Sequence, residues 1–188
     1  MVSEEVDMAI EIAKEGMDHA LEHLNNELVK IRTGKASPAM LSGLFVEYYG
    51  SPTPLNQVAN VGTSDARTIT IQPWEKKMLG PIEQSIFAAN LGITPMNDGE
   101  IIRINIPPLT EERRKTLVKQ AKHLGEEGKI SIRSSRHKVM DAIKKAVKDG
   151  YPEDAGKRRE DEVEKLVQDY SDRIDKIVEL KEKDIMTV

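Results

Sequence analysis

The fold is decided by residues 110–148, which read TEERRKTLVKQAKHLGEEGKISIRSSRHKVMDAIKKAVK. Apolar or small residues recur there at steps of three and four, the spacing of one helical face: Leu117, Ala121, Leu124, Gly128, Ile132, Val139, Ile143 and Ala146. Glu111 and Glu112 fall in the first turn, behind Thr110 as the predicted N-cap. The pattern predicts one helix of about 37 residues and roughly 55 Å, which Gly125 and Gly128 weaken locally so that a bend is possible there.

Two more amphipathic helices flank this stretch. In the N-terminal segment the apolar positions with helical spacing are Val6, Ile10, Ala13, Met17, Leu21, Leu24, Leu28 and Ile31. Ser3 is the predicted N-cap of that helix, and Gly34 and Pro38 are expected to end it. After Gly150-Tyr151-Pro152, a third stripe consists of Val163, Leu166, Val167, Tyr170, Ile174, Ile177 and Val178. No such helix buries its apolar face alone, so we expect an antiparallel three-helix bundle.

The residues between the first two helices follow a different pattern. Three β-rich runs, 44–49, 68–71 and 101–106, lie between turn signals, and residues 81–89 have the proline start of a short helix. These features predict a small β/α/β domain at 32–105, inserted into a bundle that is formed by 1–31 and 106–188. The predicted fold class is therefore α+β.

The two connections between these predicted domains are rich in Gly, Pro and Ser/Thr. Two connecting strands of that kind allow one domain to move relative to the other. The predicted hinge residues are Arg32, Thr33, Gly34 and Lys35 at the start of the insertion, and Ile106, Pro107 and Pro108 at its end.

The composition excludes several classes of function. The chain has no cysteine, which excludes disulfides, thiolate catalysis and cysteine-based zinc sites. No apolar run approaches the roughly 18 residues of a membrane span, and the N-terminus is acidic, so we expect a cytoplasmic protein with no membrane partner. Phosphate-binding loops, nucleophile elbows and a recognisable triad are absent from the sequence, so we expect no catalytic residues and no cofactor.

One pair of histidines leaves a metal-dependent enzyme as an alternative. His19 and His23 lie one helical turn apart and could hold a metal together with Glu15 or Glu22. Such pairs more often lie on a solvated helix flank. We favour that interpretation and predict no metal site.

The charge of the chain is distributed unevenly. The net charge is −4 overall, but residues 106–150 carry twelve basic and six acidic groups, whereas residues 1–30 carry two basic and eight acidic ones. Within the cationic segment a second helical face steps by three and four through Lys115, Lys119, Lys122, Glu126, Lys129, Arg133, Arg136, Met140, Lys144 and Lys148. Eight cations against one glutamate are enough to follow a phosphate backbone.

This cationic face predicts a protein that works by binding. Arg133 and Arg136 are its expected anchors, because planar guanidinium groups suit phosphates and base edges, while the lysines add diffuse charge. The segment has no aromatic residue, which favours structured RNA over unpaired bases. Two alternatives stay open: an ordinary solvated face, and a helical adaptor or chaperone that binds an acidic protein.

Several motifs together resemble the ribosome recycling factor family, and the resemblance extends over nearly the whole chain. They are Ile31-Arg32-Thr33-Gly34-Lys35-Ala36-Ser37-Pro38, then Val46-Glu47-Tyr48-Tyr49-Gly50 with Thr53-Pro54-Leu55-Asn56-Gln57, and then Leu109-Thr110-Glu111-Glu112-Arg113-Arg114. The family order, a helical bundle interrupted by a β/α/β domain on two hinge strands, is the order that the periodicity predicts.

The resemblance implies an L-shaped, monomeric factor without an active site. Such factors lie on the large ribosomal subunit after termination and, with elongation factor G and its GTP hydrolysis, split the post-termination complex. The family holds ribosomal RNA through arginines that match Arg133 and Arg136. The full predicted RNA-binding set is Arg133, Arg136, Lys129, Lys122, Lys119, Arg113 and Arg114.

Two positions depart from the family pattern. Arginine is usual where this chain has Lys35, and the second of two adjacent arginines is replaced by His137. A histidine is largely neutral at pH 7 unless phosphates raise its pKa. We therefore expect any contact at His137 to differ from that of its relatives.

Overall fold

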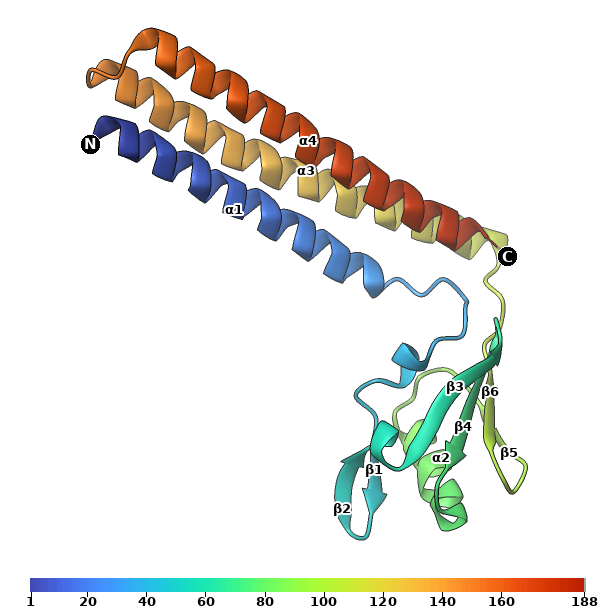
Figure 1. The fold of residues 1–188 in the computed structure, drawn as a ribbon. Coiled ribbons are helices and arrows are strands. Elements are labelled where there is room, and N and C mark those ends of the chain that lie inside the picture. The colour runs from blue at the N-terminus through green and yellow to red at the C-terminus, as the bar shows by residue number, and fades with distance from the viewer. Residues whose placement is uncertain (188) are drawn as a thin grey trace. The chain divides into compact units, whose positions relative to one another are not determined.

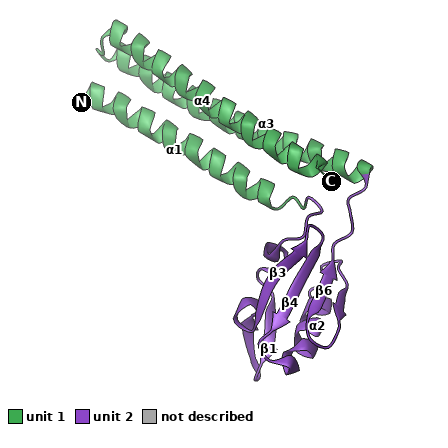
Figure 2. Ribbon diagram, turned by 45° about the vertical axis from the view of Figure 1, so that its right-hand side comes forward, with its two compact units in different colours: residues 1–32, 111–187 green, residues 33–110, 188 purple. Residues whose placement is uncertain are grey.

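The computed structural model describes residues 1–187 and divides into two compact units. Unit 1 comprises residues 1–32 and 111–187, and unit 2 comprises residues 33–110 (Figure 2). The predicted α+β class, with a small sheet domain inserted into a helical bundle, is confirmed. The boundary after the insertion lies five residues later than predicted, because residues 106–110 group with unit 2.

Unit 1 is a bundle of three long helices, α1 (Val2–Val29), α3 (Glu111–Lys148) and α4 (Glu153–Met186). The central helix α3 runs antiparallel to both neighbours, and it packs along each of them (Figure 1). One uninterrupted helix spans both Gly125 and Gly128. No helix within residues 1–187 combines the length and the apolar character that are needed to cross a membrane.

The ends of α1 differ from the prediction. The helix begins at Val2, so Ser3 lies inside its first turn and the cap position is Met1, which has no side-chain cap. It ends at Val29, ahead of Gly34. Ile31 was expected in the helical stripe, and it is buried even though it follows the helix, with its N–H bonded to the Leu28 carbonyl at 3.1 Å.

Glycines in unit 1 let the helices approach closely. A Cβ atom added to Gly125 would lie 2.7 Å from Cγ2 of Val178 on α4, which is closer than real carbon atoms pack. A Cβ added to Gly128 would lie 3.3 Å from Ile174 Cδ1. The glycines that weaken a free helix are therefore needed where α3 meets α4, and packing maintains the helix across them.

A tyrosine links the two outer helices of the bundle. Tyr170 of α4 is 2% exposed, and its hydroxyl donates a hydrogen bond to the Asp18 carboxylate of α1. Burial and the neighbouring Asp18 carboxylate raise the pKa of Tyr170 to about 12. This contact joins residues 152 positions apart in the chain.

Unit 2 contains a four-stranded antiparallel sheet in the order β3-β4-β6-β5 and a separate hairpin. The sheet strands are β3 (Ala59–Asp65), β4 (Thr68–Pro73), β5 (Pro95–Asn97) and β6 (Ile102–Asn105), and the hairpin consists of β1 (Phe45–Tyr48) and β2 (Ser51–Pro54). The helical segments are α2 (Leu79–Ala88) and the 3-10 turns η1 (Pro38–Leu41), η2 (Leu55–Gln57) and η3 (Lys76–Met78). The three predicted β-rich runs correspond to β1, β4 and β6.

The core of unit 2 lies between the sheet and α2. In the register of β4 and β6, Ile69 is opposite Ile104 and Ile71 is opposite Ile102. All four side chains are fully buried, in one cluster with Ile82 of α2. Strand alternation places Thr70 and Arg103 on the other face of the sheet, so this core is one-sided.

The two connecting segments are held at one turn of unit 2, between β3 and β4. The Ala36 N–H bonds to the Ala66 carbonyl at 2.8 Å, and the Ile106 N–H bonds to the Arg67 carbonyl at 2.7 Å. Ile106 is only 6% exposed and belongs to the core of unit 2, so it is not the linker position that was predicted.

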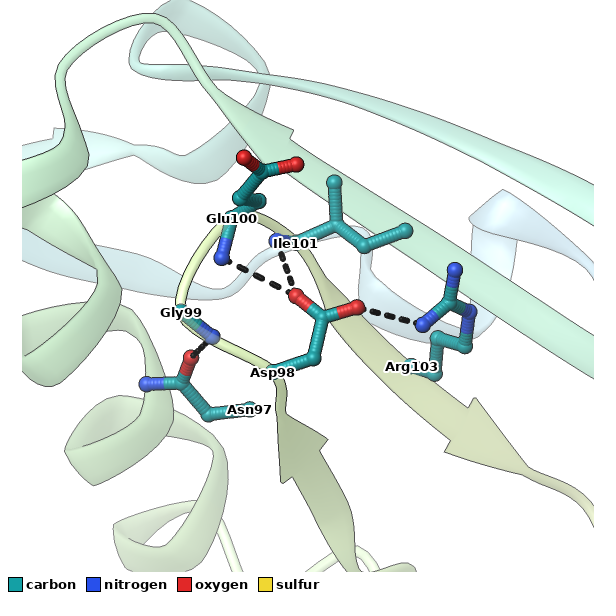
Figure 3. Close-up of polar contacts among 6 residues, drawn as sticks. All are labelled: Asn97, Asp98, Gly99, Glu100, Ile101 and Arg103. Atoms are coloured by element: carbon teal, nitrogen blue, oxygen red, sulfur yellow. Dashed lines mark hydrogen bonds and ion pairs between the residues drawn. The ribbon is translucent and has the colours of Figure 1, made fainter.

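The turn between β5 and β6 is organised by Asp98 (Figure 3). Its Oδ1 accepts hydrogen bonds from the N–H groups of Glu100 and Ile101, both at 2.9 Å, and its Oδ2 accepts one from Arg103 at 2.5 Å. Asn97 accepts the Gly99 N–H at 2.8 Å. The backbone bonds from Ile101 and Glu100 hold the pKa of the Asp98 carboxyl below its ordinary value, and Arg103 adds to the effect.

Candidate nucleic-acid interface

The outer face of α3 carries cations that bond to nothing else in residues 1–187. Arg133, Lys119 and Lys122 are exposed, and no described ion pair or hydrogen bond uses their side chains. All three project from one rigid helix, because the apolar positions Leu117, Ala121 and Ile132 fix the opposite face in the bundle core. The side chains are therefore free to meet an anionic surface.

Arg136 is in a different state from Arg133. Its Nε donates to Glu164 Oε1 of α4 at 2.9 Å, and its Nη2 makes a second, shorter bond to the same oxygen. The side chain of Arg136 is 41% exposed and that of Glu164 is 49% exposed. The hydrogen bonds and the charge of Glu164 raise the pKa of Arg136, so the guanidinium stays charged but is paired.

Lys129 is also paired across the line where α3 and α4 meet. Its Nζ lies 2.6 Å from Asp175 Oδ1, and its side chain is 23% exposed. Lys129 and Arg136 are seven residues apart, which places them on the same flank of α3. Lys129 and Arg136, both in the predicted RNA-binding set, thus already have carboxylate partners within the bundle.

The two arginines at the start of α3 have different surroundings. Arg113 is exposed. Arg114 is half-buried; its Nη1 donates to the Met186 carbonyl at the end of α4 at 3.3 Å, and its Nε is buried without a partner among the described residues. Arg114 therefore satisfies a carbonyl that the helix itself leaves unbonded.

The histidines lie at the surface of the bundle. His137 Nε2 is 3.4 Å from Asp141 one turn later on the same helix, and its side chain is 79% exposed. His19, Glu22 and His23 have the His-x-x-Glu-His order of a zinc peptidase motif. His19 Nδ1 lies 3.8 Å from Glu22, and within residues 1–187 no three metal-binding side chains are grouped so that they could hold an ion.

The sequence did not predict Glu164 and Asp175 as part of this surface. The signal that was available is the seven-residue spacing of Lys129 and Arg136, which places both on one flank of α3. The partners of that flank depend on the rotation of α4, and periodicity alone does not specify it. The structure thus separates an outward cationic row from a flank of paired cations.

The family comparison covers most of the chain. A family model described as "Ribosome recycling factor" matches residues 24–186. The ribosome-recycling factor of Christiangramia forsetii is 55% identical over 185 residues, which are 98% of this chain and 100% of that protein. The ribosome-recycling factor of Flavobacterium johnsoniae is 50% identical over 187 residues, which are 100% of both proteins.

Solved structures resemble the chain over nearly its full length. The solution structure of a ribosome recycling factor has a TM-score of 0.75 and 35% sequence identity, and the match covers 98% of each chain. The T. thermophilus ribosome recycling factor, described with E. coli elongation factor G bound to the E. coli post-termination complex, has a TM-score of 0.61 and 40% identity. That match covers 97% of this chain and 99% of the other.

Proposed function

The chain belongs to the ribosome recycling factor family, and from this membership we propose that it binds the large ribosomal subunit after termination. With elongation factor G and GTP, it promotes splitting of the post-termination complex so that ribosomes can initiate again. The factor contributes binding surface and transmits force, while GTP hydrolysis belongs to the elongation factor. The chain is then a monomeric, cytoplasmic translation factor that needs no catalytic residue and no cofactor of its own.

One observation carries the RNA part of this proposal, namely the outward cationic row on α3. Arg133 is exposed and unpaired within residues 1–187, as are Lys119 and Lys122 further toward the start of the same helix. Carboxylates on α4 neutralise the cations along the flank but not those of this row. In a protein with a net negative charge, such a cationic row favours an anionic partner. Arg133 is the proposed centre of the RNA contact, with Arg136, Lys129, Lys122, Lys119, Arg113 and Arg114 as further members.

We propose that the hinge uses the segments outside the two backbone bonds at the β3–β4 turn. On one side these are Arg32, Thr33, Gly34 and Lys35, and on the other Pro107 and Pro108. Gly34 has a φ of +79°, a left-handed conformation that side chains disfavour, so the first segment depends on glycine for its path. The two bonds keep Ala36 and Ile106 with unit 2 during any motion of the hinge.

A splitting assay tests the function as a whole. Post-termination ribosomes are incubated with elongation factor G and GTP, with or without this protein, and subunit separation is followed by light scattering. We expect splitting that needs all three components. If splitting is the same without this protein, the proposed function is wrong.

Co-sedimentation tests the RNA surface separately. Affinity for large subunits should fall with salt, with a log-log slope of about −3 to −4 if about four phosphates are contacted. Arg133→Ala and Arg136→Ala should each weaken binding by about 1–3 kcal/mol without unfolding. Arg158→Ala on α4 is the matched control and should bind like wild type. Binding that does not depend on salt would exclude RNA as the main contact.

A further inference from the structure

The guanidinium of Arg136 is only partly used by Glu164. An arginine has five N–H donors in a planar fork. Glu164 Oε1 accepts from Nε and from one hydrogen of Nη2. Both hydrogens of Nη1 and the second hydrogen of Nη2 remain. One Nη1 hydrogen and the remaining Nη2 hydrogen form a pair of parallel donors, which suits a phosphate.

The pairing also changes the charge that an RNA backbone meets. Arg136 and Glu164 together are neutral, so at distances beyond a few ångströms they neither attract nor repel a phosphate. Arg133 lies three residues earlier on α3 and has no such partner within residues 1–187. The two arginines therefore differ in kind: Arg133 attracts any phosphate, whereas Arg136 can only bond to one that reaches its remaining donors.

The pair also limits the motion of a long side chain. A free arginine loses roughly 2 kcal/mol of rotamer freedom when it is fixed in one geometry. Glu164 fixes the Nε side of Arg136 by two hydrogen bonds to one oxygen, so part of that ordering is complete before RNA arrives. Lys129 with Asp175 repeats the pairing two turns away, but an ammonium group has no second planar edge to offer.

We infer that Glu164 is a positioning residue for RNA binding, which holds Arg136 in place and cancels its long-range attraction so that Arg136 selects a correctly placed phosphate. This inference rests on the proposed function. It assigns to the Arg136–Glu164 pair the ability of the same surface to discriminate between RNAs. Selectivity matters here because every RNA offers phosphates, and free cations bind all of them.

The test compares Glu164→Gln with wild type on two RNAs, purified large subunits and a generic RNA duplex, over a series of salt concentrations. Glu164→Gln keeps the size of the side chain but releases a net positive charge at Arg136. For the duplex we expect tighter binding and a log-log salt slope that is steeper by about 0.7–0.9, the value of one more neutralised phosphate. The preference for large subunits over duplex should fall by about three- to tenfold.

Two variants test whether the effect comes from the loss of a charge alone and whether Glu164 acts through Arg136. Glu162→Gln removes the same charge from the same turn of α4, where Glu162 pairs with Arg159 at 2.8 Å, and it should leave the preference unchanged. In an Arg136→Ala background, Glu164→Gln should have no further effect on preference, because Glu164 acts through Arg136. An equal loss of preference in Glu162→Gln, or a persisting effect without Arg136, overturns the inference.

A measurement on the free protein separates this inference from the proposed function. The Arg136 Nε–H signal in ¹⁵N NMR should be protected from exchange in wild type and unprotected in Glu164→Gln. If protection is the same in both proteins, the inference is wrong even if large subunits bind. If protection is lost but neither protein binds large subunits, the proposed function fails while the Arg136–Glu164 pair stands.

Discussion

The two units bury their apolar side chains in different ways. In unit 1 the core is a narrow line along three helices, and glycines such as Gly125 let one helix approach the next, where a Cβ atom would clash with Val178. In unit 2 the core is one compact cluster, in which Ile69, Ile71 and Ile104 are fully buried beneath a single face of the sheet. Both units contain large, fully buried side chains: in unit 1 they are spread along the helices, as Met17, Ile143 and Ile174 are, and in unit 2 they lie in one cluster.

This difference bears on function, because it determines where substitutions are tolerated. A long bundle exposes most of each helix and can present a row of charges such as Lys119, Lys122 and Arg133 without affecting its core. The sheet of unit 2 also has a face away from the core, which carries Thr70 and Arg103, but all of its buried face belongs to one cluster. We therefore expect unit 1 to carry recognition and unit 2 to be sensitive to loss of a single apolar side chain of that cluster.

The largest expected effect is in the core of unit 2. Ile71→Ala should lower the free energy of unfolding of unit 2 by about 2–5 kcal/mol, because Ile71 is fully buried and its removal leaves a cavity. Trp74, the sole tryptophan, lies in unit 2, so urea unfolding followed by its fluorescence reports that unit, and far-UV circular dichroism mainly reports the bundle. The fluorescence transition should shift and the helical one should not.

The control for this comparison is Ile130→Ala. Ile130 is 59% exposed on α3, and its truncation should change stability by less than about 0.5 kcal/mol. If Ile71→Ala moved both transitions together, the two units would not be separate in their unfolding.

A smaller effect is expected from glycine substitutions, with opposite sign in the two units. Gly125→Ala should destabilise unit 1 by about 1–2 kcal/mol, because the clash with Val178 outweighs the gain in helix propensity. Gly80→Ala in α2 meets nothing within 4 Å and should stabilise unit 2 by about 0.4–1 kcal/mol. Thermal unfolding measures both variants. Relief of the Gly125→Ala defect by Val178→Ala would identify the clash as its cause.

Tyr170→Phe tests the link between α1 and α4 and should cost about 1 kcal/mol near neutral pH. The raised pKa of Tyr170, about 12, makes that link pH-dependent. An unfolded tyrosine loses its proton near pH 10, while the folded one keeps it until pH 12. The contribution is therefore complete below pH 10 and falls by about 1.4 kcal/mol per pH unit between 10 and 12.

The measurement compares wild type and Tyr170→Phe in urea at pH 8 and pH 11. The stability advantage of wild type should shrink or reverse at the higher pH. An advantage that is equal at both values would mean that Tyr170 titrates normally.

The smallest effect is expected at the β5–β6 turn of unit 2. Asp98 has a pKa below its ordinary value, because its carboxylate accepts two backbone hydrogen bonds. Its contribution to stability is present above the ordinary carboxyl range and is lost as pH falls through the lowered value. NMR titration should show the low pKa directly. In Asp98→Asn, the free energy of unfolding of unit 2 should fall less steeply as the pH is lowered. The same pH dependence in both proteins would mean that Asp98 does not stabilise the turn.

Prediction from sequence was most successful where one period persists over many residues. The three long helices follow from apolar steps of three and four, and the break at Pro152 is where α4 begins. The strands β2, β3 and β5 were not predicted. Two prolines in β2 and the Asn-Val-Gly-Thr-Ser run of β3 have weak strand propensity, and pairing with their neighbours makes them strands.

The candidate site shows the same limit. Charge and spacing identified the cationic face of α3, including Arg133. They did not separate Arg133 from Arg136, since the difference is made by Glu164, 28 residues away from Arg136 on another helix. Contacts of that kind depend on how two helices are rotated against each other, and the periodicity of one helix does not specify that rotation.

The hydrogen bonds of Ala36 to Ala66 and of Ile106 to Arg67 have a consequence for protein engineering. They hold residues near the two ends of unit 2 at two consecutive residues of one turn, so the two ends of the inserted domain lie close together. Domains whose ends lie close together tolerate insertion and circular permutation, so we expect unit 2 to keep its strand order when its ends are joined between Lys35 and Pro107.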